Sequence, residues 1–163
     1  MATNFILEID DCPGESQNRD HKDKGIDVYG FQWGVMNNST IHDGGGGGAG
    51  KCNFHPMSFT KRQDAASTKL MLKCAEGAHI PKATMFCYKQ AGNDTQELYY
   101  KIVFEDLLIN NVSLAGTGSE TSLDENCSFE AAKIKVEYKQ QAADGKMTPK
   151  GELGWDCKEN KKY

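Results

Sequence analysis

The sequence predicts a mainly β fold, in which eight or nine short strands and one helix form a closed barrel or a sandwich. Apolar and polar residues alternate in most segments between turn signals, as in strands with one face in a core. Helical periodicity occurs once, over residues 65–75. The length of 163 residues suits one domain, spanning 1–163, with a core of its own.

The first two predicted strands precede the glycine-rich stretch. Residues 4–9 form the first, and the polar residues 17–24 form an exposed loop in which His21 is expected to be a surface hydrogen-bonding residue. A second strand is predicted over 26–35. Its apolar residues change parity at Gly30, which is typical of a β-bulge.

The third strand and the helix follow a glycine-rich stretch. Residues 51–60 alternate, and Pro56 interrupts them, which predicts an edge-like or bulged strand because proline cannot donate to a ladder. The helix over 65–75 is expected to have Asp64 as its N-cap and Gly77 as its stop.

From residue 83 onward the pattern is that of strands. The predicted strands are 84–90, 97–106, 107–115, a strand around 134–138 with one face in water, and 153–157, with turns at 91–94 and 143–146. Asp124 and Glu125 are assigned to turns as solvated charges, and the tail 158–163 to a frayed, solubilising end.

Composition excludes several classes of function. The net charge of −4 and the lack of a basic patch argue against nucleic-acid binding. No apolar run is long enough for membrane insertion, and the first residues do not resemble a signal peptide. We therefore expect synthesis in the cytoplasm, and export, if any, by a route that does not read an N-terminal signal.

The six cysteines are scattered and include no C-x-x-C pair. They are expected to be mostly free thiols, although a disulfide or two stays an open alternative. Cys52 with His55 and Cys74 with His79 are only half of a zinc pattern, and no G-x-S-x-G motif occurs. The sequence thus predicts no metal, no cofactor and no enzymatic activity.

The stretch from Asp43 to Lys51 is the most unusual part of the chain. It approaches the P-loop pattern, but Cys52 stands where the motif needs a serine or threonine for magnesium. The residues that follow alternate like a strand and meet Pro56, so no helix can receive phosphates. We interpret the stretch as part of an extended loop around 36–52, either a flexible hairpin connection or a loop that contacts another chain.

Several segments together resemble the Hcp family of type VI secretion tube proteins. The segments are Phe5-Ile6-Leu7-Glu8-Ile9, Gly14-Glu15-Ser16 with His21, Ile26-Asp27-Val28, Trp33-Gly34, Gly44 to Lys51, Ser58-Phe59-Thr60-Lys61, Gly77-Ala78-His79-Ile80-Pro81, Val136-Glu137-Tyr138 and Gly154-Trp155-Asp156. Single pieces are weak, but their order and spacing over the whole chain are specific. We expect no toxin domain after Tyr163, and in this respect the chain resembles the plain tube subunit.

The resemblance implies a two-sheet β-barrel with one flanking helix, which assembles into hexameric rings that stack into a tube. In the family the tube fills a contractile sheath and is expelled into target cells, and ring lumens hold small effectors. The implied partners are further copies of the chain, sheath and spike proteins, and effectors. The implied interface between subunits or rings is Gly44, Gly45, Gly46, Gly47, Gly48, Gly50 and Lys51, and Gln32 is expected to face the lumen.

Two other classes of function stay open at this point. One is a small β-barrel that binds a ligand, for instance a lectin-like module. The other is a hydrolase that uses His21 or His79.

Overall fold

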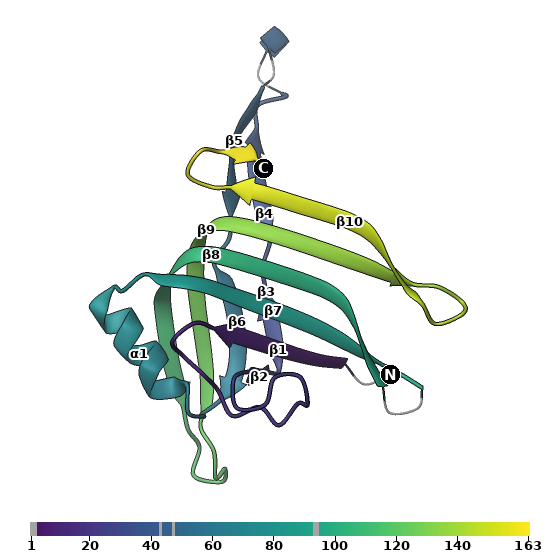
Figure 1. Cartoon of the computed structure of the whole chain (residues 1–163). Coiled ribbons are helices and arrows are strands. Elements are labelled where there is room, and N and C mark those ends of the chain that lie inside the picture. The colour runs from purple at the N-terminus through teal and green to yellow at the C-terminus, as the bar shows by residue number, and fades with distance from the viewer. Residues whose placement is uncertain (1–2, 43, 47, 93–94) are drawn as a thin grey trace.

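A large antiparallel sheet curves around the core, and a narrow two-stranded sheet projects from it (Figure 1). This computed structural model describes residues 3–42, 44–46, 48–92 and 95–163. The elements are β1 (Thr3–Ile9), β2 (Ile26–Val28), β3 (Gly30–Gln32), β4 (Val35–Ser39), the 3-10 helix η1 (Gly44–Gly46), β5 (Ala49–Phe54), β6 (Met57–Arg62), α1 (Ser67–Glu76), β7 (Ile80–Ala91), β8 (Thr95–Ala115), β9 (Asp124–Gln141), β10 (Met147–Asp156) and β11 (Lys161–Lys162). The prediction of a mainly β fold with one α-helix is confirmed.

Over the described ranges the large sheet has nine strands and does not close into a ring. Its main order is β11-β10-β9-β8-β7-β1-β2, and β6 pairs with both β3 and the first half of β9. Within the described residues no ladder joins β2 to β3; the nearest link is the N–H of Tyr29, which donates to the carbonyl of Thr60 at 2.9 Å. The expectation of a closed barrel is therefore wrong. Between β2 and β3 the backbone continues through Tyr29, and the two strands form no ladder within the described residues.

The parity change at Gly30 has a different cause from the predicted bulge. The segment 26–35 is not one strand: β2 pairs with β1, whereas β3 pairs with β6. Tyr29 lies between the two strands and is exposed. The chain thus changes its partner strand at this point, and the apolar side chains change face because the local sheet changes.

The long strands β8 and β9 carry the bend of the large sheet. The predicted strands 97–106 and 107–115 are one strand, in which the buried side chains change parity after Phe104 and resume at Leu107. Asp106 at this bend has φ of 52°, a left-handed conformation. An irregular residue here lets both halves of β8 face the same core, as a bulge does.

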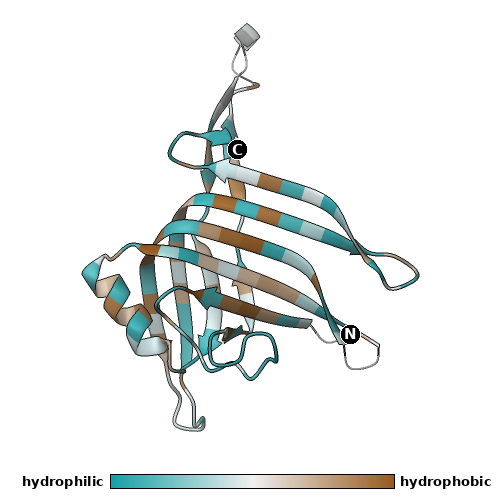
Figure 2. Cartoon of the chain, viewed as in Figure 1, coloured by the Kyte–Doolittle hydropathy of each residue, from teal (hydrophilic) through white to brown (hydrophobic). Residues whose placement is uncertain are grey.

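Alternation along the strands is visible as bands of hydrophilic and hydrophobic residues in Figure 2. It confirms the predicted pattern of β9, where Ile134 and Val136 are buried between exposed lysines. The core combines one face of the large sheet with the inner face of α1. Its largest fully buried apolar side chains are Phe59, Phe104, Phe129, Leu7, Ile26, Met57, Leu70, Ile80, Met85, Ile102 and Leu107.

The helix begins later than the sequence predicts. Its N-cap is Ala66, without a side-chain capping hydrogen bond, and Asp64 instead holds the turn before it by accepting from the N–H of Ala66 at 2.9 Å. Its stop is confirmed: Gly77 adopts a left-handed φ of 61°.

Two further expectations need correction. His21 is buried rather than a surface residue, because the loop 17–24 folds back onto β1 and β7. The C-terminal tail is not wholly frayed, since Lys161–Lys162 pair with Trp155 and Asp156 of β10.

The six cysteines are free thiols. Among the described residues, no helix has both the length and the apolar character needed to cross a membrane.

Candidate assembly surface

The projecting hairpin consists of β4 and β5, which form a sheet of their own (Figure 1). Val35 pairs with Phe54 at its base and Ser39 with Ala49 near its end. Side chains of β4 help to hold the pair: the Asn37 amide donates to the carbonyl of Gly50 at 2.9 Å. All five residues of β4 are exposed, whereas Cys52 and Phe54 of β5 are half-buried, so the hairpin is open to its surroundings mainly along β4.

The predicted interface residues lie at the end of this hairpin. Gly44, Gly45 and Gly46 form η1, and Gly48, Gly50 and Lys51 lie in or next to β5, while Gly47 lies outside the described residues. Gly44 has φ of 73°, a conformation that favours glycine. Lys51 is exposed and is followed by strand residues, so its surroundings are not those of a P-loop.

Glycine at position 50 is required by close packing. A Cβ atom there would lie 2.7 Å from the backbone oxygen of Asn38 on the opposite strand. A Cβ atom at Gly45 would meet nothing within 4 Å. The two glycines thus have different surroundings. Gly50 allows the two strands to approach closely, whereas Gly45 lies in open space at the end of the hairpin.

Aromatic rings support the base of the hairpin. Phe54 stacks on Trp33 with ring centroids 5.5 Å apart, and Trp33 meets Phe104 of the core edge-to-face at 5.6 Å. Trp155 of β10 completes the group, 6.4 Å from Phe54. These contacts fix where the hairpin leaves the large sheet, whereas the segment beyond them has few contacts with it.

Three exposed apolar side chains of the hairpin were not among the predicted interface residues. Val35, Met36 and Ile41 are 55%, 49% and 69% exposed, respectively. Each of these side chains loses contact with water if another protein surface covers the hairpin. Their signal in the sequence is weak, because single apolar residues in a polar strand look like ordinary surface positions.

Gln32 lies on the large sheet, away from the hairpin tip. It is exposed at the end of β3, beside an open groove of about 390 Å³. The groove is lined by residues of β3, β6, β8 and β9, and the polar ones include Ser58, Asn111, Asn126 and Ser128. The predicted lumen residue and the predicted interface glycines therefore belong to two separate surfaces.

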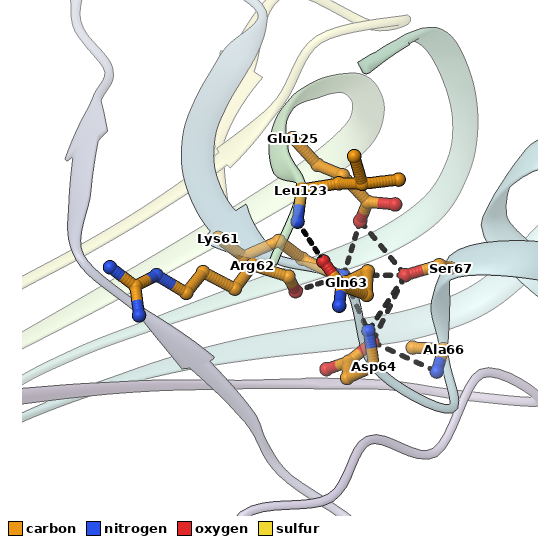
Figure 3. Close-up of polar contacts among 8 residues, drawn as sticks. All are labelled: Lys61, Arg62, Gln63, Asp64, Ala66, Ser67, Leu123 and Glu125. Atoms are coloured by element: carbon orange, nitrogen blue, oxygen red, sulfur yellow. Dashed lines mark hydrogen bonds and ion pairs between the residues drawn. The ribbon is translucent and has the colours of Figure 1, made fainter. Parts of the chain in front are cut away.

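A buried ionic cluster, which the sequence did not reveal, braces the sheet beside α1 (Figure 3). The side chain of Lys61 has no exposed surface, and its ammonium forms an ion pair with Glu125 of β9. It also contacts Asp64 Oδ1 at 2.9 Å and Ser67 Oγ at 3.0 Å. Glu125 is buried in a strand, so its assignment to a solvated turn is wrong.

A family model matches this chain over residues 6–138, described as "Type VI secretion system effector, Hcp". The chain belongs to the Hcp family. It is 37% identical to protein Hcp1 of Pseudomonas aeruginosa, over 98% of each chain. Among solved structures it is similar to a type six secretion system protein, with a TM-score of 0.90 and 29% identity over 99% and 100% of the two chains. Hcp1 from Salmonella typhimurium gives a TM-score of 0.78 and 32% identity over both whole chains.

Membership of the Hcp family confirms the resemblance found in the sequence and decides between the classes of function. The chain is a secreted structural tube protein of type VI secretion and not an enzyme. The family therefore supports the tube-protein interpretation over a lectin-like module.

The two histidines considered for hydrolysis have structural surroundings in this Hcp protein. His21 Nδ1 lies 2.6 Å from Glu8 Oε1, and His21 Nε2 lies 2.5 Å from Tyr88 Oη. Burial, with Asp20 and Glu8 nearby, raises the pKa of Tyr88 to about 12. The phenol therefore keeps its proton. With Glu8 on Nδ1 and the Tyr88 phenol on Nε2, both ring nitrogens of His21 have hydrogen-bond partners. This chain of hydrogen bonds fastens the loop to β1 and β7.

His79 is exposed at the start of β7. Its Nδ1 lies 2.6 Å from Asp106 Oδ1, and Lys158 Nζ donates to Asp106 Oδ2 at 2.8 Å. The hydrogen bonds from Lys158 and His79 lower the pKa of Asp106. Within the described ranges no group of three or more histidine, cysteine, aspartate or glutamate side chains has the arrangement of a metal site.

Proposed function

We propose that this Hcp protein is a single-domain subunit, residues 1–163, which assembles with copies of itself into hexameric rings that stack into a tube. The observation that carries the proposal is the hairpin β4–β5, which projects from the large sheet with all of β4 exposed (Figure 1). In this proposal the hairpin contacts the neighbouring ring. Its end, from Gly44 to Gly48 with Gly50 and Lys51, adapts to that surface.

An isolated hairpin lacks a third strand and a packed face. Two strands alone are marginally stable in water, and a third partner or a packed face stabilises them. The exposed side chains of Val35, Met36 and Ile41 would lose contact with water when they dock on a second copy. A contact between unlike surfaces of identical subunits closes into a ring when its rotation closes, and stacks along an axis when it repeats by translation.

The second surface of the proposal is the groove beside Gln32. In a ring that places this face inward, the polar side chains along the groove would line the lumen and contact small effectors during export. The further partners are the sheath and the spike of the secretion machine. The subunit would be made in the cytoplasm without a signal peptide and leave through the type VI machine.

Native mass spectrometry and negative-stain imaging of the full chain test the proposal. The chain is expected to form rings and stacks at protein concentrations on the order of tens of micromolar, where weak interfaces are populated. Ile41→Asp places a charge on the end of the hairpin and is expected to leave rings intact while it removes stacks. Leu72→Asp, at a similarly exposed apolar position on α1, is the matched control and is expected to keep the stacks.

Two outcomes would contradict the proposal. A chain that stays monomeric under these conditions would remove the ring itself. Rings that stack equally well with Ile41→Asp and without it would show that the hairpin is not the contact between rings.

A further inference from the structure

Two cysteines far apart in the sequence face one small cavity between the hairpin and the main sheet. Cys52 belongs to β5, and Cys157 follows the last residue of β10. Both line a cavity of about 210 Å³, together with residues of β9 and the aromatic base of the hairpin. Both side chains are half-buried, so a small reagent can reach them.

One hydrogen bond fixes how close the two segments are. The Cys52 thiol donates to Asn160 Oδ1 at 3.3 Å. Residues 157–160 form the turn between β10 and β11, and the ends of a four-residue turn lie within about 7 Å of each other. Cys157 therefore lies within the width of a single turn from the residue that Cys52 already contacts.

Among the residues that the structure describes, this contact is also the hairpin's single polar link to the rest of the molecule. Within the described residues, every other hydrogen bond of residues 35–54 stays inside the hairpin. The thiol of Cys52 is a weak donor, so the link itself is weak. A covalent bond at the same place would change how firmly the hairpin is held.

The other cysteines lie in places that suit packing rather than chemistry. Cys12, Cys87 and Cys127 are buried in the core, and burial raises the pKa of Cys87 and of Cys127 to about 12. Cys74 lies on α1, away from the cavity. Cys52 and Cys157 are thus the pair that combines access to reagent with a common cavity.

We propose that Cys52 and Cys157 are a redox-active pair, which a low-molecular-weight disulfide such as oxidised glutathione converts into an intramolecular disulfide between the hairpin and the C-terminal turn. The inference goes beyond the proposed assembly and does not depend on it. A secreted protein passes from a reducing to an oxidising environment, where such a bond persists.

The reaction is thiol–disulfide exchange in two steps. The Cys52 thiolate attacks one sulfur of the reagent, forms a mixed disulfide and releases the first reagent thiolate. The Cys157 thiolate then attacks the Cys52 sulfur and releases the second. In total, the two protein thiols lose two protons and two electrons and become one disulfide. The reagent disulfide takes up these protons and electrons and becomes two thiols. Burial, with Cys52 nearby, raises the pKa of Cys157, so the second step is expected to accelerate with rising pH.

Intact mass and peptide mapping of the oxidised full chain test the pair directly. The chain has six free cysteines, so one internal disulfide should lose the mass of two hydrogens and leave four cysteines for alkylation after denaturation. Peptide mapping without reduction is expected to find Cys52 joined to Cys157. Amide hydrogen exchange of residues 35–54 is expected to slow in the oxidised chain, and to return to its first rate after reduction.

Substitution separates this pair from the other thiols. Cys52→Ser and Cys157→Ser are each expected to abolish the internal disulfide, whereas Cys74→Ser, the matched half-buried control, is expected to keep it. A different pairing, a disulfide between two chains, or a glutathione adduct on Cys52 that persists at high pH would each overturn the proposal. Peptide mapping of the unsubstituted chain shows which cysteines are joined even if a variant folds poorly. The measurement does not depend on ring formation.

Discussion

The ammonium of Lys61 has no contact with water, and this single residue explains how the sheet is joined beside α1. Its three N–H donors meet four oxygens: those of Asp64, Ser67 and Glu125 and the carbonyl of Arg62 at 2.9 Å. These residues come from β6, the turn before α1, the start of α1 and β9. Burial of the charge is tolerated because both carboxylates and the hydroxyl compensate for the lost hydration.

Lys61→Met tests this cluster. The change keeps much of the side-chain volume but leaves Glu125 and Asp64 without their cation, so the free energy of unfolding is expected to fall by about 3–5 kcal/mol. Urea unfolding, followed by circular dichroism, measures the difference. Lys61→Met combined with Glu125→Leu removes the buried pair together and is expected to recover most of the loss. A single variant as stable as the parent would contradict the role assigned to the ion pair.

The sequence contains part of the signal for this cluster. Met57, Phe59 and Lys61 share one parity, so an alternating strand that buries the first two also buries the lysine. The partner cannot be read from the same pattern, because Glu125 lies 64 positions further along the chain. Only the ladder between β6 and β9, which pairs Lys61 with Glu125 directly, brings the two charges together.

The pairing of β4 with β5 requires the two backbones to lie close together at Gly50 and Asn38. Gly50→Ala would place a Cβ atom 2.7 Å from the Asn38 oxygen, so the strands must move apart. We expect this to weaken the pairing by about 1–3 kcal/mol, as overpacking does. Amide hydrogen exchange over residues 35–54 should then be faster, while global unfolding changes little. Gly45→Ala, which meets no atom within 4 Å, is the control and should exchange like the parent.

The sequence predicted elements well where the pattern is local and less well where the partner strand decides. The alternation of β9 and the stop at Gly77 need only neighbouring residues, and both are confirmed. The division of 26–35 into β2 and β3 depends on two different partners, β1 and β6, which no local pattern contains. Similarly, Asp64 looks like an N-cap, but its carboxylate is needed by Lys61 and the turn before Ser67.

The long strands β8 and β9 join the two parts of the large sheet. The first half of β8 pairs with β7, and residues 100–115 of β8 pair with β9, which also meets β6 and β10. The bend at Asp106 lets one continuous strand serve both parts. The same residue binds His79, beside the start of β7, and Lys158, in the turn after β10, so its carboxylate links three separate segments.

Because of these contacts the stability of the molecule should depend on pH through Asp106. The hydrogen bonds from Lys158 and His79 lower the pKa of Asp106 in the folded chain below its ordinary value of 3.8. A carboxyl group whose pKa is lower in the folded state adds stability above the ordinary value. That stability is lost as the pH falls through 3.8 and then through the lower folded value.

Asp106→Asn isolates this contribution, because asparagine also tolerates the left-handed φ of 52°. The variant is expected to be less stable than the parent at neutral pH, and the difference should shrink to nothing in acid, once the parent carboxylate is protonated. Urea unfolding of both chains at a series of pH values measures it. Asp144→Asn, in the exposed turn between β9 and β10, is the control and should show no such convergence. A difference for Asp106→Asn that persists unchanged in acid would mean that the side-chain shape, and not the charge, holds the three segments together.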